Sequence, residues 1–161
     1  MRKRIYMKKL FTAIRASNLE MVRQVIEKKP ALVNCVAKQP PKKDDGQSPL
    51  QVALKTGNIA IANYLLDMGA DVNALDSYGN SGMNRFALQA KQILPSYNYV
   101  EHCEGTDRIF TEELHEDLRN VLQALKDAGG DEEYRAPNLG YSVRKFCSEG
   151  SISILFDEVF G

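Results

Sequence analysis

The clearest structural pattern in the chain lies at residues 45–76, which read DGQSPLQVALKTGNIAIANYLLDMGADVNALD. Ser48 and Pro49 indicate a helix start, because a serine hydroxyl caps free amides and a proline at the first helical position loses no hydrogen bond. Gly57 and Gly69 stand where a helix ends in a left-handed residue. Between these markers the apolar side chains recur at helical spacing: Leu50, Ala53, Leu54, Ile61, Leu65 and Leu66. The stretch therefore predicts two short antiparallel helices.

The same pattern recurs along the rest of the chain. Six apolar residues (Leu10, Ala13, Ile14, Leu19, Val25 and Ile26) lie 40 positions before Leu50, Ala53, Leu54, Ile59, Leu65 and Leu66, an offset of one 33-residue period plus seven inserted residues. Downstream, Gly69 matches Gly129 at an offset of 60, which is one period plus 27 inserted residues. Gly57 matches Gly150 at 93, two periods plus the same 27. One inserted block thus accounts for the downstream offsets and predicts four copies of one unit.

This unit resembles the ankyrin repeat, with Ser-Pro-Leu in place of the usual Thr-Pro-Leu-His opening and Gly-Ala-Asp-Val-Asn at its close. The third and fourth copies depart further, with Ser-Gly-Met-Asn and Tyr-Ser-Val-Arg at the opening. The resemblance implies an all-α ankyrin-repeat solenoid: stacked helix–turn–helix units with short β-hairpin fingers. One domain over 1–161 is expected, with repeats at about 8–34, 45–74, 76–131 (insertion 91–111) and 138–161 as a C-terminal cap. The alternative, a tetratricopeptide array, needs a 34-residue period and lacks the Gly-Ala-Asp-Val-Asn segment.

Composition narrows the class of partner. Lys+Arg and Asp+Glu both number 21, so no net field attracts nucleic acid or an anionic membrane, and neither is expected as a partner. The apolar run behind the basic first ten residues is too short for a signal peptide or a membrane span. Three cysteines without CxxC spacing fit a reducing compartment and no zinc ribbon. We therefore expect a cytoplasmic protein without cofactor or metal.

The resemblance implies a non-enzymatic module that binds one protein partner, as a monomer or in a 1:1 complex. In the family, finger tips and the exposed side of the first helix of each repeat contact the partner. The matching residues here are Gln47, Gln51, Lys55, Tyr78, Asn80, Asn84 and Arg85. The alternative interpretation is that these side chains are only solvated polar positions.

The two insertions are the other predicted contact regions. Residues 35–45 lengthen the first finger, where Lys42 and Lys43 are expected to pair with an acidic partner; a tolerated surface loop is the alternative. The long insertion at 91–111 carries aromatic residues of the kind that anchor interfaces. Its predicted contacts are Tyr97, Tyr99, Glu101 and His102. The alternative is that its aromatic side chains pack back onto their own repeat.

Size and architecture resemble the ankyrin-type immunity proteins that bacteria pair with toxins. This likeness suggests a stoichiometric inhibitor, such as the immunity protein of a cytosol-acting bacterial toxin. A bacterial ankyrin effector that engages a host protein is the alternative. A second alternative is a metal or thiol enzyme centred on His102 and Cys103, which is disfavoured because adjacent side chains of an extended chain diverge.

Overall fold

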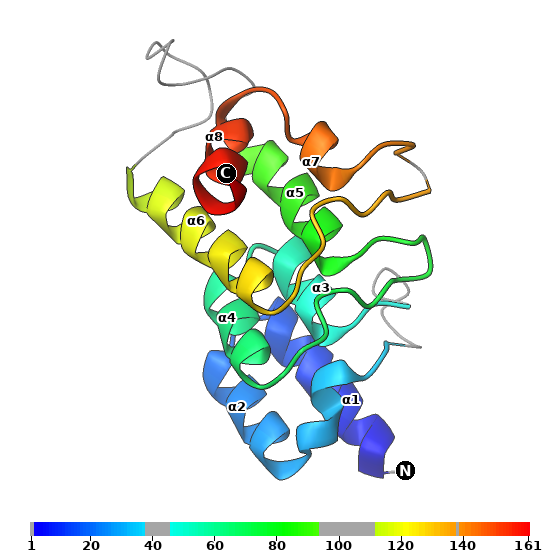
Figure 1. Ribbon diagram of the computed structural model, residues 1–161. Helices are drawn as coiled ribbons and strands as arrows, with labels where there is room; N and C mark the ends of the chain where they lie inside the picture. The colour runs from blue at the N-terminus through cyan, green and yellow to red at the C-terminus, as the bar shows by residue number, and fades with distance from the viewer. Residues whose placement is uncertain (1, 38–45, 94–111, 138) are drawn as a thin grey trace.

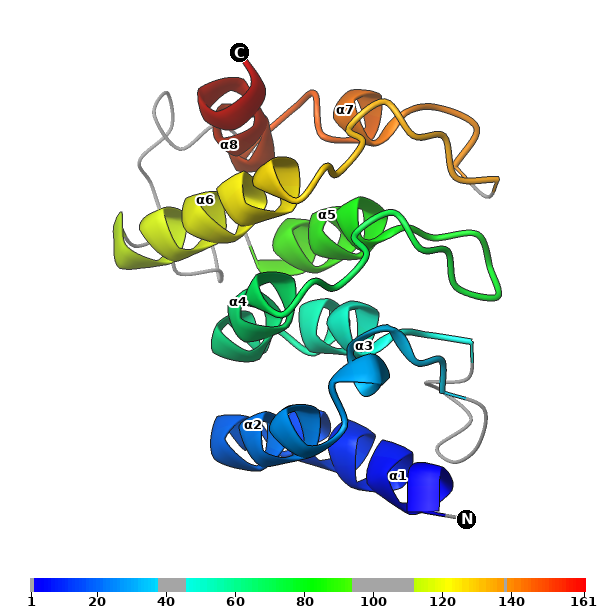
Figure 2. The same cartoon turned by 60° about the horizontal axis from the view of Figure 1, so that its bottom comes forward.

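The computed structural model describes residues 2–37, 46–93, 112–137 and 139–161, which form a stack of paired helices (Figure 1). The first helices of the pairs are α1 Arg2–Arg15, α3 Pro49–Lys55, α5 Gly82–Ile93 and α7 Val143–Phe146. Their partners are α2 Leu19–Lys28, α4 Ile59–Asp67, α6 Glu112–Asp127 and α8 Ser151–Phe160, and a 3-10 helix, η1, covers Pro30–Asn34. Figure 2 shows the first helices as an inner column beside the connecting loops and their partners as an outer column. The expected all-α ankyrin solenoid is thus confirmed.

The backbone keeps the register that the sequence predicts. Gly57 and Gly150, which precede the second helix of their pairs, have φ of 74° and 76°. Gly69 and Gly129, which follow the second helix, have φ of 92° and 91°. These angles lie in the left-handed region that glycine adopts without strain. The same turn is therefore built at residues 60 or 93 positions apart.

One apolar core runs through the described part of the chain from α1 to α8. Inner helices pack in the order α1, α3, α5 and α7, while α2, α4, α6 and α8 pack in order beside them. Ala53 is fully buried in α3, which has an inner helix on either side, as expected for a small residue that allows close approach. Farther along, Phe86 of α5 and Phe156 of α8 lie 6.4 Å apart between ring centroids. Each pair therefore completes the core of its neighbour.

Two asparagines join successive pairs at the outer edge of the stack. Asn34 donates to the carbonyl of Gly69 at 3.3 Å and accepts from the Asp71 amide at 2.8 Å. Asn73, the last residue of Gly-Ala-Asp-Val-Asn, donates to Gly129 O at 2.8 Å and accepts from the amide of Asp131 at 3.2 Å. We call this repeated contact the asparagine clamp, and it holds each turn against the next.

The fingers are the segments between pairs, and their described residues are 35–37 with 46–48, 69–81, and 129–137 with 139–142. The expected β-hairpins appear here as loops: the described residues hold no strand, only an isolated antiparallel bridge between Arg135 and Ser142. In the first finger, Ala37 exchanges backbone bonds with Gly46 and Gln47 at 2.7 and 2.8 Å. Side chains supply further hydrogen bonds to the backbone of the second finger. No described helix is long and apolar enough to cross a membrane.

Replacing Gly69 by alanine tests the backbone register. A Cβ here meets no atom within 4 Å, so the only cost is the positive φ of 92°, expected at about 1 kcal/mol of unfolding free energy. Asparagine tolerates this conformation better and serves as the matched control. Urea denaturation of both variants measures the effect; equal losses for Gly69→Ala and Gly69→Asn would contradict the explanation.

Candidate functional site

Gln51 joins α3 to the second finger. Its side chain and that of Ser48 form a capping box, with Gln51 N to Ser48 Oγ at 3.2 Å and Ser48 N to Gln51 Oε1 at 2.8 Å. The amide nitrogen of the same side chain donates to the carbonyls of Ala74 and Asn80 at 2.8 and 2.9 Å. Gln51 is 2% exposed. It therefore acts inside the fold and fixes the base of the finger.

Asp76 organises the same finger from within. One carboxylate oxygen accepts from the amides of Tyr78 and Asn80, both at 2.9 Å, and the other accepts from the Arg85 guanidinium, with Nε at 3.1 Å. The carboxylate side chain is fully buried. Burial would raise the pKa of Asp76, but the bonds from Asn80, Arg85 and Tyr78 outweigh it and hold the pKa below its ordinary value. The finger thus closes on a buried ion pair.

The expectation of exposed contact residues is wrong for Gln47, Gln51, Asn80 and Asn84, because all four side chains are buried. For Gln51 the physical reason is that the carbonyls of Ala74 and Asn80 at the finger base need donors, and its side chain supplies them. Asn80 and Asn84 bond instead to neighbouring side chains, Asn80 to Asp76 Oδ2 and Asn84 to Asn80 Oδ1, both at 3.4 Å. The side-chain oxygen of Gln47 is buried without a hydrogen-bond partner among the described residues. The Ser-x-x-Gln spacing of the capping box was the sequence signal that could have indicated an inward Gln51.

The remaining predicted contacts divide between exposed, half-buried and undescribed positions. Tyr78 lies on the second finger and is 72% exposed, as a contact residue should be. Lys55 and Arg85 are half-buried, and Arg85 is engaged by Asp76. Six calls lie outside the described residues: Lys42, Lys43, Tyr97, Tyr99, Glu101 and His102.

The structure adds exposed apolar residues that the sequence reasoning missed. Val36 lies on the first finger, Leu75 on the second, three residues before Tyr78, and Tyr141 on the third. We give the name finger ridge to these three residues together with Tyr78. They form most of the large exposed apolar side chains in the described chain, the others being Ile5 and Met68. Each of the three fingers therefore presents at least one apolar contact; Figure 1 shows these loops projecting on one side of the stack.

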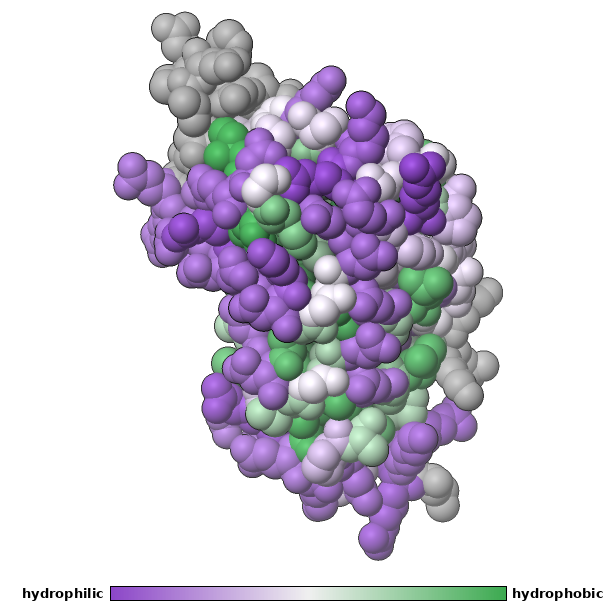
Figure 3. Space-filling model, viewed as in Figure 1, coloured by the Kyte–Doolittle hydropathy of each residue, from purple (hydrophilic) through white to green (hydrophobic). Residues whose placement is uncertain are grey.

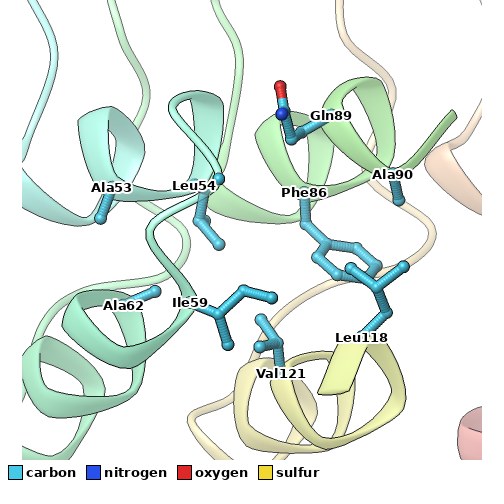
Figure 4. Close-up of a pocket in the computed structure, with 10 residues that line it drawn as sticks. Ala53, Leu54, Ile59, Ala62, Phe86, Gln89, Ala90, Leu118 and Val121 are labelled. Atoms are coloured by element: carbon cyan, nitrogen blue, oxygen red, sulfur yellow. The ribbon is translucent and has the colours of Figure 1, made fainter. Parts of the chain in front are cut away.

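An apolar pocket lies between the α3–α4 and α5–α6 pairs (Figure 4). Its walls include Ala53 and Leu54 of α3, Phe86 of α5 and Leu118 of α6, and Gln89 is the polar side chain among its lining residues. No charged group in the described lining could orient a ligand. We interpret the pocket as a packing gap between two repeats.

The described residues contain neither a metal-binding cluster nor a reactive cysteine. No group of three or more His, Cys, Asp and Glu side chains there is arranged to hold a metal ion. His115 binds the carboxylate of Glu158 at 3.0 Å. Burial raises the pKa of the Cys35 thiol to about 11 and that of Cys147 to about 12, so both are protonated at neutral pH and poor nucleophiles. His102 and Cys103, the centre of the enzyme hypothesis, lie outside the described residues.

Two comparisons relate this chain to known proteins. Residues 6–76 match the family model described as ankyrin repeats in three copies. The chain is also similar to the ankyrin repeat and SAM domain-containing protein 6 of Rattus norvegicus, with 26% identity over 149 residues. That alignment covers 80% of this chain and 16% of the relative, so the chain spans about one sixth of the relative's length.

Asp76→Asn tests the buried ion pair. At pH 7 the variant should lose about 2 kcal/mol of unfolding free energy, because charge-assisted bonds from Arg85 and two amides are weakened. The pKa of Asp76 in the folded state lies below the unfolded value of 3.8. The stabilisation of the native state by the ionised carboxylate is therefore full above pH 3.8 and is lost as pH falls through the folded pKa. Urea denaturation at pH 7, 4 and 3 should therefore show the difference shrinking. Asp67→Asn, at an exposed position, is the control and should show no comparable trend.

Proposed function

Because this chain is an ankyrin-repeat protein, we propose that it is a non-enzymatic protein–protein interaction module that binds one protein partner through its finger ridge. The observation that carries the proposal is the placement of Val36, Leu75, Tyr78 and Tyr141, one or two on each finger. Single exposed apolar residues are ordinary, but their concentration on one structural feature is typical of an interface. Tyrosine is also enriched among the residues that dominate binding energy.

The second finger is held ready for binding. Gln51 bonds to two of its carbonyls, and Asp76 bonds to the amides of Tyr78 and Asn80. Tyr134 of the third finger donates its hydroxyl to the carbonyl of Gly79 at 2.6 Å, so adjacent fingers brace each other. A loop fixed in this way loses little entropy when a partner docks. The backbone that carries Leu75 and Tyr78 is therefore preorganised.

Within this class, the proposed role is stoichiometric inhibition: the stack covers a functional surface of its partner, as an immunity protein covers a bacterial toxin. The braced second finger, which carries Leu75 and Tyr78 of the ridge, supports occlusion as the mechanism. The proposed setting is the cytoplasm, which the free thiols of Cys35 and Cys147 fit.

The test is affinity capture of the partner from the source cell, followed by titration of the identified partner against purified variants. Tyr78→Ala should weaken binding by about thirtyfold, the effect of losing an interface anchor worth about 2 kcal/mol. Its thermal stability should be unchanged, because the side chain is 72% exposed and the finger is held by backbone groups of this residue.

Met68→Ala is the matched control. Met68 is also exposed and apolar, but it is the C-cap residue of α4 and lies outside the finger. It should bind within about twofold of the native chain. Wild-type affinity in the double variant Leu75→Ala with Tyr78→Ala would show that the finger ridge is not the partner surface.

A further inference from the structure

Basic and acidic residues are unequally divided between the two helix columns, although their totals in the chain are equal. The inner helices α1, α3, α5 and α7 together contain eleven Lys and Arg and no Asp or Glu. The outer helices α2, α4, α6 and α8 contain ten Asp and Glu against four Lys and Arg. The inner helix column is therefore basic and the outer helix column acidic, and Figure 2 shows both columns running the length of the stack.

Part of this inner positive charge is neutralised within the fold. Arg85 is paired with Asp76, and Arg144 lies 3.0 Å from Glu132 and 2.6 Å from Asp157. The basic side chains at the start of α1 have no such partners among the described residues. They are Arg2, Lys3, Arg4, Lys8 and Lys9, and all are exposed. The uncompensated charge is therefore concentrated on α1, at the end of the stack where Figure 3 shows hydrophilic residues projecting.

An apolar residue stands in the middle of this charged face. Ile5 is 60% exposed. On the helix surface its neighbours three and four positions away are Arg2, Lys8 and Lys9. The apolar stripe of α1 faces the opposite way and is buried against α2 and α3. The exposed face thus offers one apolar contact with cations around it.

Tyr6 lies beside this face and is surrounded by lysine side chains. The ammonium groups of Lys28 and Lys29 lie 5.4 and 5.9 Å from the centre of its ring. A hydrogen bond from Lys28 lowers the pKa of Tyr6, burial opposes this, and the charges of Lys28, Lys29 and Lys9 lower it further. Basic residues from α1 and from the end of α2 therefore act on one area.

We propose that this basic face of α1, defined by Arg2, Arg4, Ile5, Lys8 and Lys9, docks an acidic surface segment of the protein partner. The inference rests on the proposed function and adds the chemistry of the partner: Asp and Glu side chains around an apolar residue that meets Ile5. Charge complementarity of this kind steers association and selects among partners.

An acidic protein segment fits this face better than a membrane or a nucleic acid does. Interfacial helices insert a whole apolar face into a membrane, whereas α1 has its apolar face in the core and only Ile5 outside. Single-stranded nucleic acid is usually held by exposed aromatic platforms, and Tyr6, the aromatic residue nearest this face, is half-buried. The acidic outer column also opposes a long polyanion that extends beyond the inner side.

The experiment titrates the native chain with a 20-residue poly-L-glutamate peptide, a 20-base-pair DNA duplex, and phosphatidylcholine vesicles containing one-fifth phosphatidylserine. Polyglutamate is expected to bind with an affinity that falls as salt rises, and to shift backbone amide NMR signals of α1 first. Lys8→Gln with Lys9→Gln should weaken this binding by about tenfold, the effect of losing two exposed charge contacts.

The matched control changes the net charge by the same amount on the outer column. Gln24→Glu with Asn120→Glu alters exposed residues of α2 and α6 and should leave polyglutamate binding within about twofold of native. The inference is overturned if this control weakens binding as much as the α1 variant. It is equally overturned if duplex DNA or vesicles bind more tightly than the peptide.

The captured partner separates this inference from the proposed function. If its binding needs Tyr78 but is insensitive to salt and to the Lys8/Lys9 change, the acidic-partner inference fails and the interaction module stands. If no Tyr78-dependent partner exists, the proposed function fails, and with it the inference. Loss of partner affinity in both variants, with folding intact by circular dichroism, supports both.

Discussion

Each helix pair of this chain can bury its apolar stripe only against the next pair, and the rest of the structure depends on that constraint. A two-helix unit with stripes as short as Leu50 to Leu54 has too little core of its own. Ala53, fully buried between neighbouring inner helices, shows how close the approach is. The asparagine clamp also makes each pair depend on the next, because Asn34 and Asn73 form hydrogen bonds to the following unit. Stability and shape are therefore properties of the stack.

Buried and exposed side chains of the fingers have different roles. Buried groups such as Gln51 and Asp76 satisfy the finger backbone and hold its shape, while exposed groups such as Tyr78 remain available to a partner. A partner consequently meets a surface whose conformation is already fixed. This is the arrangement that favours tight binding with few anchors.

Charge follows the same two-column architecture. Basic residues on the inner helices and acidic residues on the outer helices cancel in the total, so composition alone suggests an electrically neutral molecule. The helical pairing sorts them onto opposite sides. A protein without net charge can therefore present a cationic face to one partner, and its far field remains weak.

The repeat, its turns and its helices could be predicted from the sequence, because they depend on local spacing: Gly69 and Gly129 have nearly the same φ, 92° and 91°, as their common register requires. The sequence also identified Tyr78 as exposed. It could not decide the direction of Gln51, Asn80 and Asn84, since the partners that these side chains meet inside the fold come from the folded finger: two carbonyls for Gln51, the Asp76 carboxylate for Asn80 and the Asn80 side chain for Asn84. Leu75 and Val36 were missed for the converse reason, because no pattern shows that an apolar loop residue lacks a neighbour. Which side chains face inward, and which side of the stack is basic, was decided by the tertiary packing of separate repeats.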